Sequence, residues 1–317
     1  MVYVPLMPLR DVLNGYLRAP RDFFGIPPPS EGDPTVGVLG IPYDLTSSYS
    51  PGARWGPDAI RRATDSERST SYPLSLGSDK RHMEPLSKQM TLEDIGDLEV
   101  MLRLPESAAV DIAEAAALLA KNESKLLFLG GDHFITYPLV RGLSRGRPGT
   151  YGLVYFDAHA DYYENMGGYQ FSHASTVRRI VEENLVRLEH VAAFDIRSAV
   201  PDQRTSFQGG SDAEPVSVRS FRGTVKNVAD SVDMLYVSLD LDVFDPALVP
   251  GVAHPESGGP TFADVVSCLD AAFETGKVRY ADIVEFNPLL DPTTTTSTTA
   301  RDILKEILFG FSGPQAF

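Results

Sequence analysis

Residues 152–161 read Gly-Leu-Val-Tyr-Phe-Asp-Ala-His-Ala-Asp, an apolar run that stops at an alternating row of acid and imidazole side chains. A strand without polar residues on either face is buried on both sides, which is typical of a parallel sheet covered by helices. In such sheets, ligands bind beyond the carboxyl ends of the strands. The stretch therefore predicts both a fold class and the position of a functional site.

Further apolar runs recur along the chain, each followed by a polar turn. They cover residues 36–41, 125–129, 191–194, 234–241 and 280–284. Patterns typical of helices lie between them. These patterns cover residues 58–63, 107–119, 173–183 and 261–275. Strands that alternate with helices predict an α/β protein, a three-layer αβα sandwich with a central parallel sheet and right-handed crossovers.

Local signals indicate where helices and domains begin. Pro57 and Thr261 are expected at helix starts, and the threonine run at 293–299 predicts a loop and N-cap before a helix at 300–308. No repeat divides the chain, so residues 1–317 are expected to form a single catalytic domain, with residues 1–35 as an N-terminal extension. The polar segments at 65–90 and 200–225 predict surface excursions.

The composition narrows the classes of protein. The chain has 28 lysine and arginine residues against 43 acidic ones, and its net charge of −15 opposes nucleic acid binding and favours small cationic ligands. The start lacks the features of a signal peptide, and no run approaches about 18 apolar residues, so no membrane segment is expected. We expect a cytoplasmic protein, whose single cysteine, Cys268, cannot form an internal disulfide.

Acid or imidazole residues lie at or just past the ends of four of the predicted strands. The four segments are Gly130-Gly131-Asp132-His133, Asp157-Ala158-His159-Ala160-Asp161, Asp240-Leu241-Asp242 and Glu285-Phe286-Asn287-Pro288. Because the carboxyl ends of parallel strands meet at one edge of a sheet, we expect these side chains to converge on one site.

The row Asp157-x-His159-x-Asp161 is the most specific of these segments. A lone histidine after a Gly-Gly turn is more often a packing residue, and Asp-x-Asp at a strand end is often a solvated turn. Alternation in an extended segment, by contrast, aims three side chains the same way, and such groups stay poorly satisfied unless a cation lies among them. The candidate metal ligands are His133, Asp157, His159, Asp161, Asp240 and Asp242.

Six such ligands suit two ions better than one. Four carboxylates and two imidazoles without a thiolate favour a hard or borderline metal, Mn²⁺ first, with Ni²⁺, Co²⁺ and Fe²⁺ as alternatives. Two ions about 3.5–4 Å apart lower the pKa of a shared water toward neutrality, which predicts a hydrolase.

Together, the three metal motifs resemble those of the ureohydrolase family, which contains the arginases and agmatinases. The segments that carry the resemblance are 48–57, 130–133, 157–161 and 238–246. They stand in the family's order, and the agreement extends from about residue 37 to about residue 308. The resemblance implies an arginase-like fold, two Mn²⁺ per chain and the release of urea from a small cationic guanidino substrate.

The resemblance also implies a role for each ligand. His133 binds one ion and His159 the other, with Asp157 and Asp240 as bridges. The remaining two aspartates of the set complete the two coordination shells.

Other residues are implied to act on the substrate. His173, Glu285 and Asp161 form the implied catalytic set. Within it, Glu285 accepts the guanidinium as a charge-assisted pair, and His173 carries a proton to the leaving amine. Glu164 is expected to pair with a substrate amine.

The branch of the family follows from the loop after Asp161. It lacks the Asn-Thr-Pro and Ser-Gly-Asn type of segment with which arginases recognise an amino-acid head group, and it looks like the agmatinase branch. Two residues depart from the family pattern. Phe134 replaces a serine or threonine, and His254 replaces a threonine that faces the guanidinium. The larger ring of His254 is expected to bind the substrate and to shrink the pocket or change its selectivity.

Agmatine hydrolysis to putrescine and urea, a step of polyamine biosynthesis, is the leading expectation. The nearer alternative is another guanidino compound, such as guanidinobutyrate, arginine or a smaller guanidine. A single-metal amide hydrolase of the related deacetylase fold and a non-catalytic relative are further alternatives. The resemblance also implies a homotrimer or homohexamer.

Overall fold

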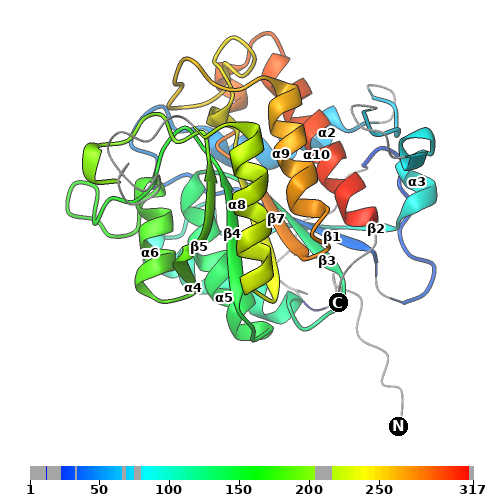
Figure 1. Ribbon diagram of the computed structural model, residues 1–317, viewed down its shortest axis with the longest axis horizontal. Coiled ribbons are helices and arrows are strands. Elements are labelled where there is room, and N and C mark those ends of the chain that lie inside the picture. Colours follow the sequence, from blue (N-terminus) through cyan, green and yellow to red (C-terminus); the bar gives the residue numbers. More distant parts are fainter. Residues whose placement is uncertain are drawn as a thin grey trace.

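Seven parallel strands form one sheet through the middle of the described chain, in the order β2-β1-β3-β7-β6-β4-β5 (Figure 1). The computed structural model describes residue 12 and residues 23–32, 34–65, 69–74, 80–203 and 216–313. The strands are β1 (Val36–Ile41), β2 (Leu92–Asp97), β3 (Lys125–Gly130), β4 (Tyr151–Phe156), β5 (Val186–Phe194), β6 (Met234–Asp240) and β7 (Val278–Val284).

All six predicted apolar runs form strands, which confirms the central parallel sheet. The edge strand β2 was not predicted, because its sequence Leu-Glu-Asp-Ile-Gly-Asp carries three acids. Two of these acids pair with the buried Arg61 of α2 (Gly56–Ala63). Its Nε and Nη2 donate to the Asp94 carboxylate at 2.9 Å each, and its Nη1 donates to Asp97. A cation from a neighbouring helix therefore compensates the acids of this edge strand.

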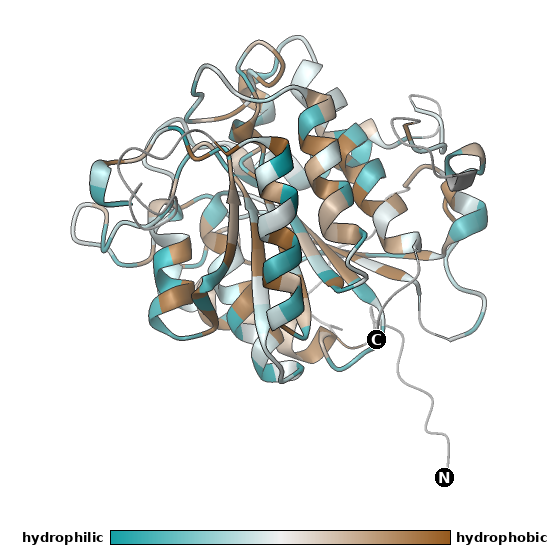
Figure 2. Cartoon of the chain, in the orientation of Figure 1, coloured by the Kyte–Doolittle hydropathy of each residue, from teal (hydrophilic) through white to brown (hydrophobic). Residues whose placement is uncertain are grey.

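Helices cover both faces of the sheet, as predicted for an αβα sandwich. One layer contains α2, α8 (Val218–Ser231), α9 (Phe262–Phe273) and α10 (Thr295–Ser312). The other contains α4 (Pro105–Leu119), α5 (Thr136–Gly146) and α6 (Thr176–Glu182). The short α3 (Leu86–Gln89) lies beside α10. Apolar residues line the strands and the inward helix faces, so each face of the sheet has its own hydrophobic core (Figure 2).

The helix starts test the predictions from local signals. Thr261 caps α9 in a capping box with Asp264, as expected. The threonine run at 293–299 forms the predicted turn and N-cap only at Thr293 and Thr294, because α10 begins inside the run, at Thr295. The carboxylate of Asp291 explains this start, since it accepts the backbone N–H groups of Thr296 and Ser297 and so satisfies the first turn.

The predicted surface excursions are only partly correct. Helix α8 begins at Val218, inside the segment 200–225, and α3 lies inside the segment 65–90. Residues 66–68, 75–79 and 204–215 of these segments, and most of the predicted extension at residues 1–35, lie outside the described residues. None of the described helices combines the length and the apolar character that a membrane span requires.

Candidate metal centre

Four neighbouring strands bring the predicted site residues to one edge of the sheet. Strands β3, β7, β6 and β4 are adjacent in the sheet order and parallel, so their carboxyl ends lie together. Asp157 follows β4 directly, Asp240 is the last residue of β6, and Glu285 follows β7. His133 begins a 3-10 turn three residues after β3. The convergence that the sequence predicted is therefore present.

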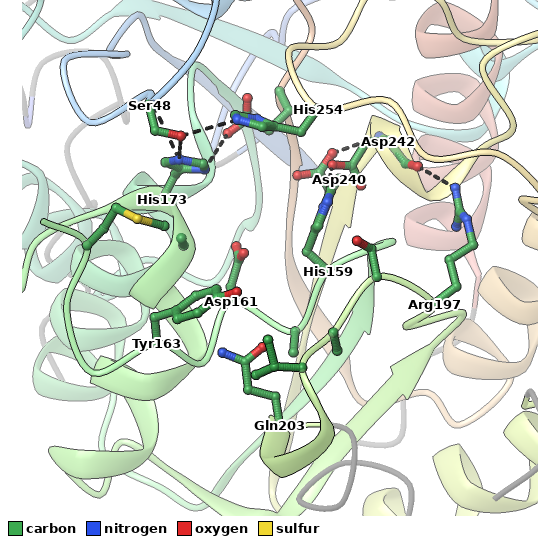
Figure 3. A pocket seen from close by; sticks show the side chains of 17 residues that line it. Ser48, His159, Asp161, Tyr163, His173, Arg197, Gln203, Asp240, Asp242 and His254 are labelled. Atoms are coloured by element: carbon green, nitrogen blue, oxygen red, sulfur yellow. Dashed lines mark hydrogen bonds and ion pairs between the residues drawn. The ribbon is translucent and has the colours of Figure 1, made fainter. Parts of the chain in front are cut away.

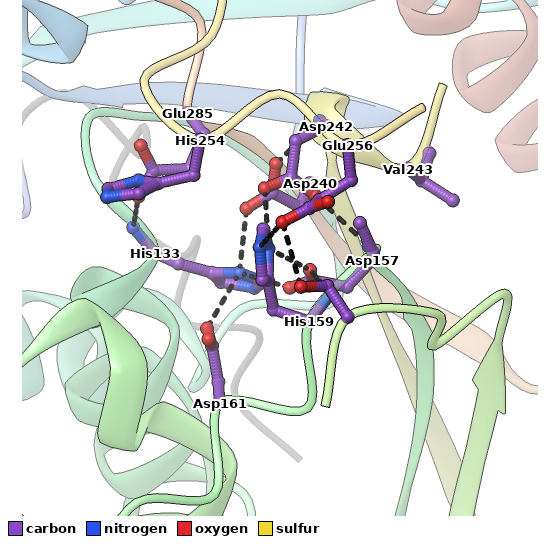
Figure 4. A network of polar contacts seen from close by, with 12 residues as sticks. His133, Asp157, His159, Asp161, Asp240, Asp242, Val243, His254, Glu256 and Glu285 are labelled. Carbon is purple, nitrogen blue, oxygen red and sulfur yellow. Dashed lines mark hydrogen bonds and ion pairs between the residues drawn. The ribbon is translucent and has the colours of Figure 1, made fainter. Parts of the chain in front are cut away.

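A buried histidine nitrogen lies at the centre of the first group of ligand atoms (Figure 4). Nδ1 of His133 is 3.0 Å from Asp157 Oδ2, 3.1 Å from Asp240 Oδ2 and 3.3 Å from Asp161 Oδ2. The nitrogen is buried, yet no described atom is aligned with it for a hydrogen bond. Three carboxylate oxygens around an unpaired nitrogen form a set of donors that a divalent cation would satisfy.

A second group shares one aspartate with the first. Nδ1 of His159 lies 2.9 Å from Asp242 Oδ2 and 3.4 Å from Asp157 Oδ1. Asp157 thus presents one oxygen to each histidine. Both groups, His133 with Asp157 and Asp161, and Asp157 with His159 and Asp242, could hold a metal ion. The His159 side chain is 25% exposed and that of His133 is 1% exposed, and only His159 of the two lines the cavity over the cluster, so the second group is the more accessible one.

The electrostatics of the cluster also fit bound cations. Burial and the charge of the neighbouring Asp157 raise the pKa of Asp161 to about 8. Burial and the charge of Asp242 raise the pKa of Asp240 well above its usual value. Burial alone would lower the pKa of His133, but Asp157 and Asp240 raise it well above its usual range. Without a metal the site must therefore retain protons, and divalent ions can take their place.

The backbone reaches this arrangement through two strained residues. Asp161 has φ 44° and Glu285 has φ 64°, both in the left-handed region that non-glycine residues rarely adopt. The sequence predicted that the segment 157–161 is extended throughout, and this prediction is wrong at Asp161. The chain turns at Asp161, whose carbonyl accepts the N–H groups of Val177 and Arg178 at the start of α6. Such strain is typical of functional sites, where the surrounding structure maintains it.

Glu285 lies beside the first group without joining it. Its side chain is buried, and its Oε1 accepts the backbone N–H of His133 at 2.8 Å. Burial and the charge of Asp132 raise the pKa of Glu285 well above its usual value. Glu285 also lines the cavity over the cluster, where its carboxylate can accept donors from a ligand.

Two histidines and a serine form the neighbouring wall of the cavity (Figure 3). The rings of His173 and His254 stack, with centroids 5.0 Å and planes 23° apart. The Ser48 hydroxyl lies between them, 3.1 Å from His173 Nε2 and 3.2 Å from His254 Nε2. Burial lowers the pKa of His173 to about 3, so this ring is neutral at pH 7. Ser48 belongs to one of the segments that resemble the family, but the sequence predicted no role for it.

A cavity of about 520 Å³ opens over these groups. Its outer wall includes Tyr163, Met166, Val200 and Gln203. Glu164, expected to pair with a substrate amine, is exposed and is not among the residues that line this cavity.

Phe134 and Arg197 both lie near the site. Phe134 is buried in the core and packs against Tyr43, Tyr137 and Phe171, so it does not reach the cavity. Arg197, which sequence reasoning missed, borders the cavity. Its guanidinium donates to the carbonyls of residues 242–244, 256 and 257 and to the Asp195 carboxylate. Arg197 therefore links the loop after β6 to the loop after β5.

Comparisons with known proteins identify the family of this chain. The model of the Arginase family matches residues 34–310. An agmatinase of Pyrococcus horikoshii is 36% identical over 251 residues, which are 78% of this chain and 82% of the relative. A mitochondrial arginase 1 of Arabidopsis thaliana is 31% identical over 86% of this chain and 80% of its own length. Among solved structures, the proclavaminate amidino hydrolase of Streptomyces clavuligerus superimposes with a TM-score of 0.74, at 28% identity, over 94% of this chain and 98% of the other.

Proposed function

Since the chain belongs to the arginase family, we propose that it is a two-metal ureohydrolase that converts agmatine to putrescine and urea. The observation that carries the proposal is the position of Glu285 beside the His133 cluster at the base of one cavity. A buried carboxylate next to a metal group suits a planar cation such as guanidinium. The similarity to an agmatinase supports the choice of agmatine.

The six predicted ligands would hold the ions. His133, Asp157, Asp161 and Asp240 surround one position, and His159 and Asp242 complete a second that shares Asp157. Two Mn²⁺ are proposed, with Ni²⁺ or Co²⁺ as alternatives, because the donors are carboxylates and imidazoles. When bound, the pair supplies an activated water as the nucleophile.

The residues of the cavity wall would bind the substrate and move a proton. Glu285 accepts the guanidinium N–H groups and orients the central carbon toward the ions. The backbone N–H of Ser48 donates to His173 Nε2, so the neutral ring carries its proton on Nδ1. That Nδ1 lies 3.9 Å from Glu285 Oε1. From there the ring can relay a proton: Nδ1 gives its proton to the departing amine while Nε2 takes one up from the cavity, so the ring stays neutral.

His254 supports a second candidate within the same chemistry. Its ring borders the cavity and stacks on His173, where the family resemblance leads us to expect a threonine. A larger ring leaves less room beside the guanidinium, which favours a guanidino compound smaller than agmatine, such as methylguanidine. Guanidinobutyrate and arginine complete the set of substrates to compare.

The direct test is urea release from a panel of guanidino compounds by protein loaded with Mn²⁺, Ni²⁺ or Co²⁺. We expect turnover of agmatine that disappears in Glu285→Gln. Turnover of another guanidino compound alone would contradict the choice of substrate. Absence of urea from every compound and metal would contradict the function itself. A trimer or hexamer belongs to the same proposal and is tested by mass photometry.

A further inference from the structure

Asp282 is a buried carboxylate that the proposed reaction does not use. It lies in β7, three residues before Glu285, and it is not among the residues that line the cavity. Its Oδ2 accepts the hydroxyls of Thr136 and Tyr236, each at 2.6 Å, and its Oδ1 accepts the Ser238 hydroxyl at 2.8 Å. A buried carboxylate is costly unless it is well hydrogen-bonded, and three hydroxyl donors meet that need.

The Ser238 hydroxyl connects this carboxylate to His133. Its oxygen lies 2.9 Å from His133 Nε2 as well as 2.8 Å from Asp282 Oδ1. A serine hydroxyl has one proton, and the ionised carboxylate can only accept. Ser238 therefore donates to Asp282 and accepts from His133. The Thr136 hydroxyl, 3.4 Å from Ser238, also donates to Asp282 and does not alter this direction.

The direction of these hydrogen bonds determines which ring nitrogen of His133 carries the proton. If Nε2 donates to Ser238, then in the neutral ring Nδ1 holds a lone pair. Nδ1 is the atom that lies 3.0–3.3 Å from three carboxylates and has no aligned hydrogen-bond partner among the described residues. A lone pair there points into the first metal group.

We propose that Asp282 is a positioning residue for metal binding: through Ser238 it holds His133 in the Nε2-protonated tautomer and so presents Nδ1 to the ion. Metal-ligating histidines are generally oriented by an acceptor on their other nitrogen. Here the acceptor is the Ser238 hydroxyl, which donates its own proton to the buried carboxylate of Asp282. The inference rests on the proposed function only in that a cation binds at this group.

His159 provides an internal comparison. Its outer Nε2 lies 3.6 Å from Glu256 Oε1, and the Glu256 side chain is 41% exposed. That carboxylate also accepts the Ser198 hydroxyl at 2.8 Å. The second histidine thus has a longer and more solvated contact on its outer nitrogen than His133 has. Loss of the Asp282 contact should therefore affect the first metal group selectively.

Asp282→Asn tests the proposal with little change of shape. The amide oxygen can still accept from Thr136 and Tyr236, while the amide nitrogen, in place of Oδ1, donates to Ser238. The Ser238 proton then turns to His133 Nε2 and favours the Nδ1-protonated ring, which has no lone pair for a metal. We expect Mn²⁺ affinity at one of two positions to fall about 10–100-fold, measured by equilibrium dialysis with elemental analysis.

Nitrogen-15 NMR of histidine-labelled, metal-free protein, recorded at a pH high enough for the His133 ring to have lost one proton, reads the tautomer without any activity assay. We expect the proton of His133 on Nε2 in the wild type and on Nδ1 in Asp282→Asn, with the signals assigned by a His133→Gln variant. Tyr236→Phe removes one donor to Asp282 but leaves Ser238 in place, so it should keep the Nε2 proton. Glu256→Gln should also leave the His133 signals unchanged.

An Nε2 proton retained in folded Asp282→Asn, or wild-type Mn²⁺ affinity at both positions, would overturn the proposal. If Asp282→Asn does not fold, Ser238→Ala is informative instead, because it should yield a mixture of tautomers, and an unchanged Nε2 proton would contradict us. The NMR measurement needs neither metal nor substrate, so a failure of the proposed function would not decide it.

Discussion

The imidazole of His254 stacks on that of His173 at a centroid distance of 5.0 Å. The two residues lie 81 positions apart in the chain, and the loops after β4 and β6 bring them together over the cavity. Ser48, from the loop after β1, joins them through its hydroxyl. The residue proposed to move a proton therefore contacts the residue that departs from the family pattern, and we expect a change at His254 to affect both selectivity and proton transfer.

His254→Thr should shift selectivity toward longer substrates. Removal of the ring enlarges the cavity beside Glu285, and a change of pocket size is worth about 1–3 kcal/mol between homologous substrates. We expect the ratio of kcat/KM for agmatine to that for methylguanidine to rise about tenfold. Phe134→Leu, the other departure, should leave this ratio unchanged because Phe134 does not reach the cavity. An unchanged ratio in His254→Thr would argue against a role in selectivity.

His173→Asn should reduce kcat far more than it changes KM. The variant keeps a polar side chain but loses the Nδ1 proton that faces Glu285, and general acid catalysis is worth about 100-fold or more. Ser48→Ala should have a smaller effect, because the backbone N–H of Ser48 still orients His173 Nε2. Steady-state urea release separates the two parameters. Equal losses in both variants would point to a structural role for the whole wall.

Arg61→Leu should destabilise the fold strongly. The guanidinium lies buried against Asp94 and Asp97 of the edge strand β2, so its removal takes away the cation that contacts both carboxylates. Loss of one partner from a buried pair costs about 3–5 kcal/mol. Arg62→Leu is the matched control, because Arg62 is 58% exposed and pairs with Asp58 one helical turn away. It should change the free energy of unfolding by less than about 0.5 kcal/mol in urea denaturation. Similar values for the two variants would contradict this assignment.

Glu306 should make stability fall as the pH rises. Burial raises its pKa from 4.5 to about 7, while its Oε1 accepts the backbone N–H of Leu74 at 2.6 Å. Between these two pKa values the folded state binds more protons than the unfolded state, so the contribution of Glu306 is present at pH 4 and is lost as the pH approaches 7.

The corresponding measurement compares wild type with Glu306→Gln. Between pH 4.5 and 7.5 the free energy of unfolding of the wild type should fall by about 2 kcal/mol relative to that of the variant. Urea denaturation at each pH measures this difference. Parallel pH profiles of the two proteins would show that Glu306 does not titrate in this range.

Much of the fold and the ligand cluster could be predicted because the relevant signals are local. An apolar run and the acid after it lie within ten residues, as in 152–161, and parallel topology then brings the strand ends together. The edge strand β2 was missed because its acids are compensated by Arg61, about 30 residues earlier. Helix α10 was predicted to begin too late because the capping residue of its first turn, Asp291, precedes the threonine run.

The parts of the site that could not be predicted depend on distant contacts. Ser48 and His254 are separated by 206 positions, and no local pattern indicates that their side chains meet. The turn at Asp161 depends on its contact with the start of α6, which an alternating sequence does not reveal. Asp282 did leave a visible signal, a carboxylate inside the apolar run at 280–284, but its partners come from β6 and α5.

The count of metal ions per folded chain tests the central claim most directly. Asp157 faces both histidines, with Oδ2 at 3.0 Å from His133 Nδ1 and Oδ1 at 3.4 Å from His159 Nδ1, as expected of a residue between two ions. Elemental analysis of protein dialysed against Mn²⁺ and freed of excess metal should give two ions per chain, and fewer in folded Asp157→Ala. One ion per wild-type chain, or none, would contradict the account.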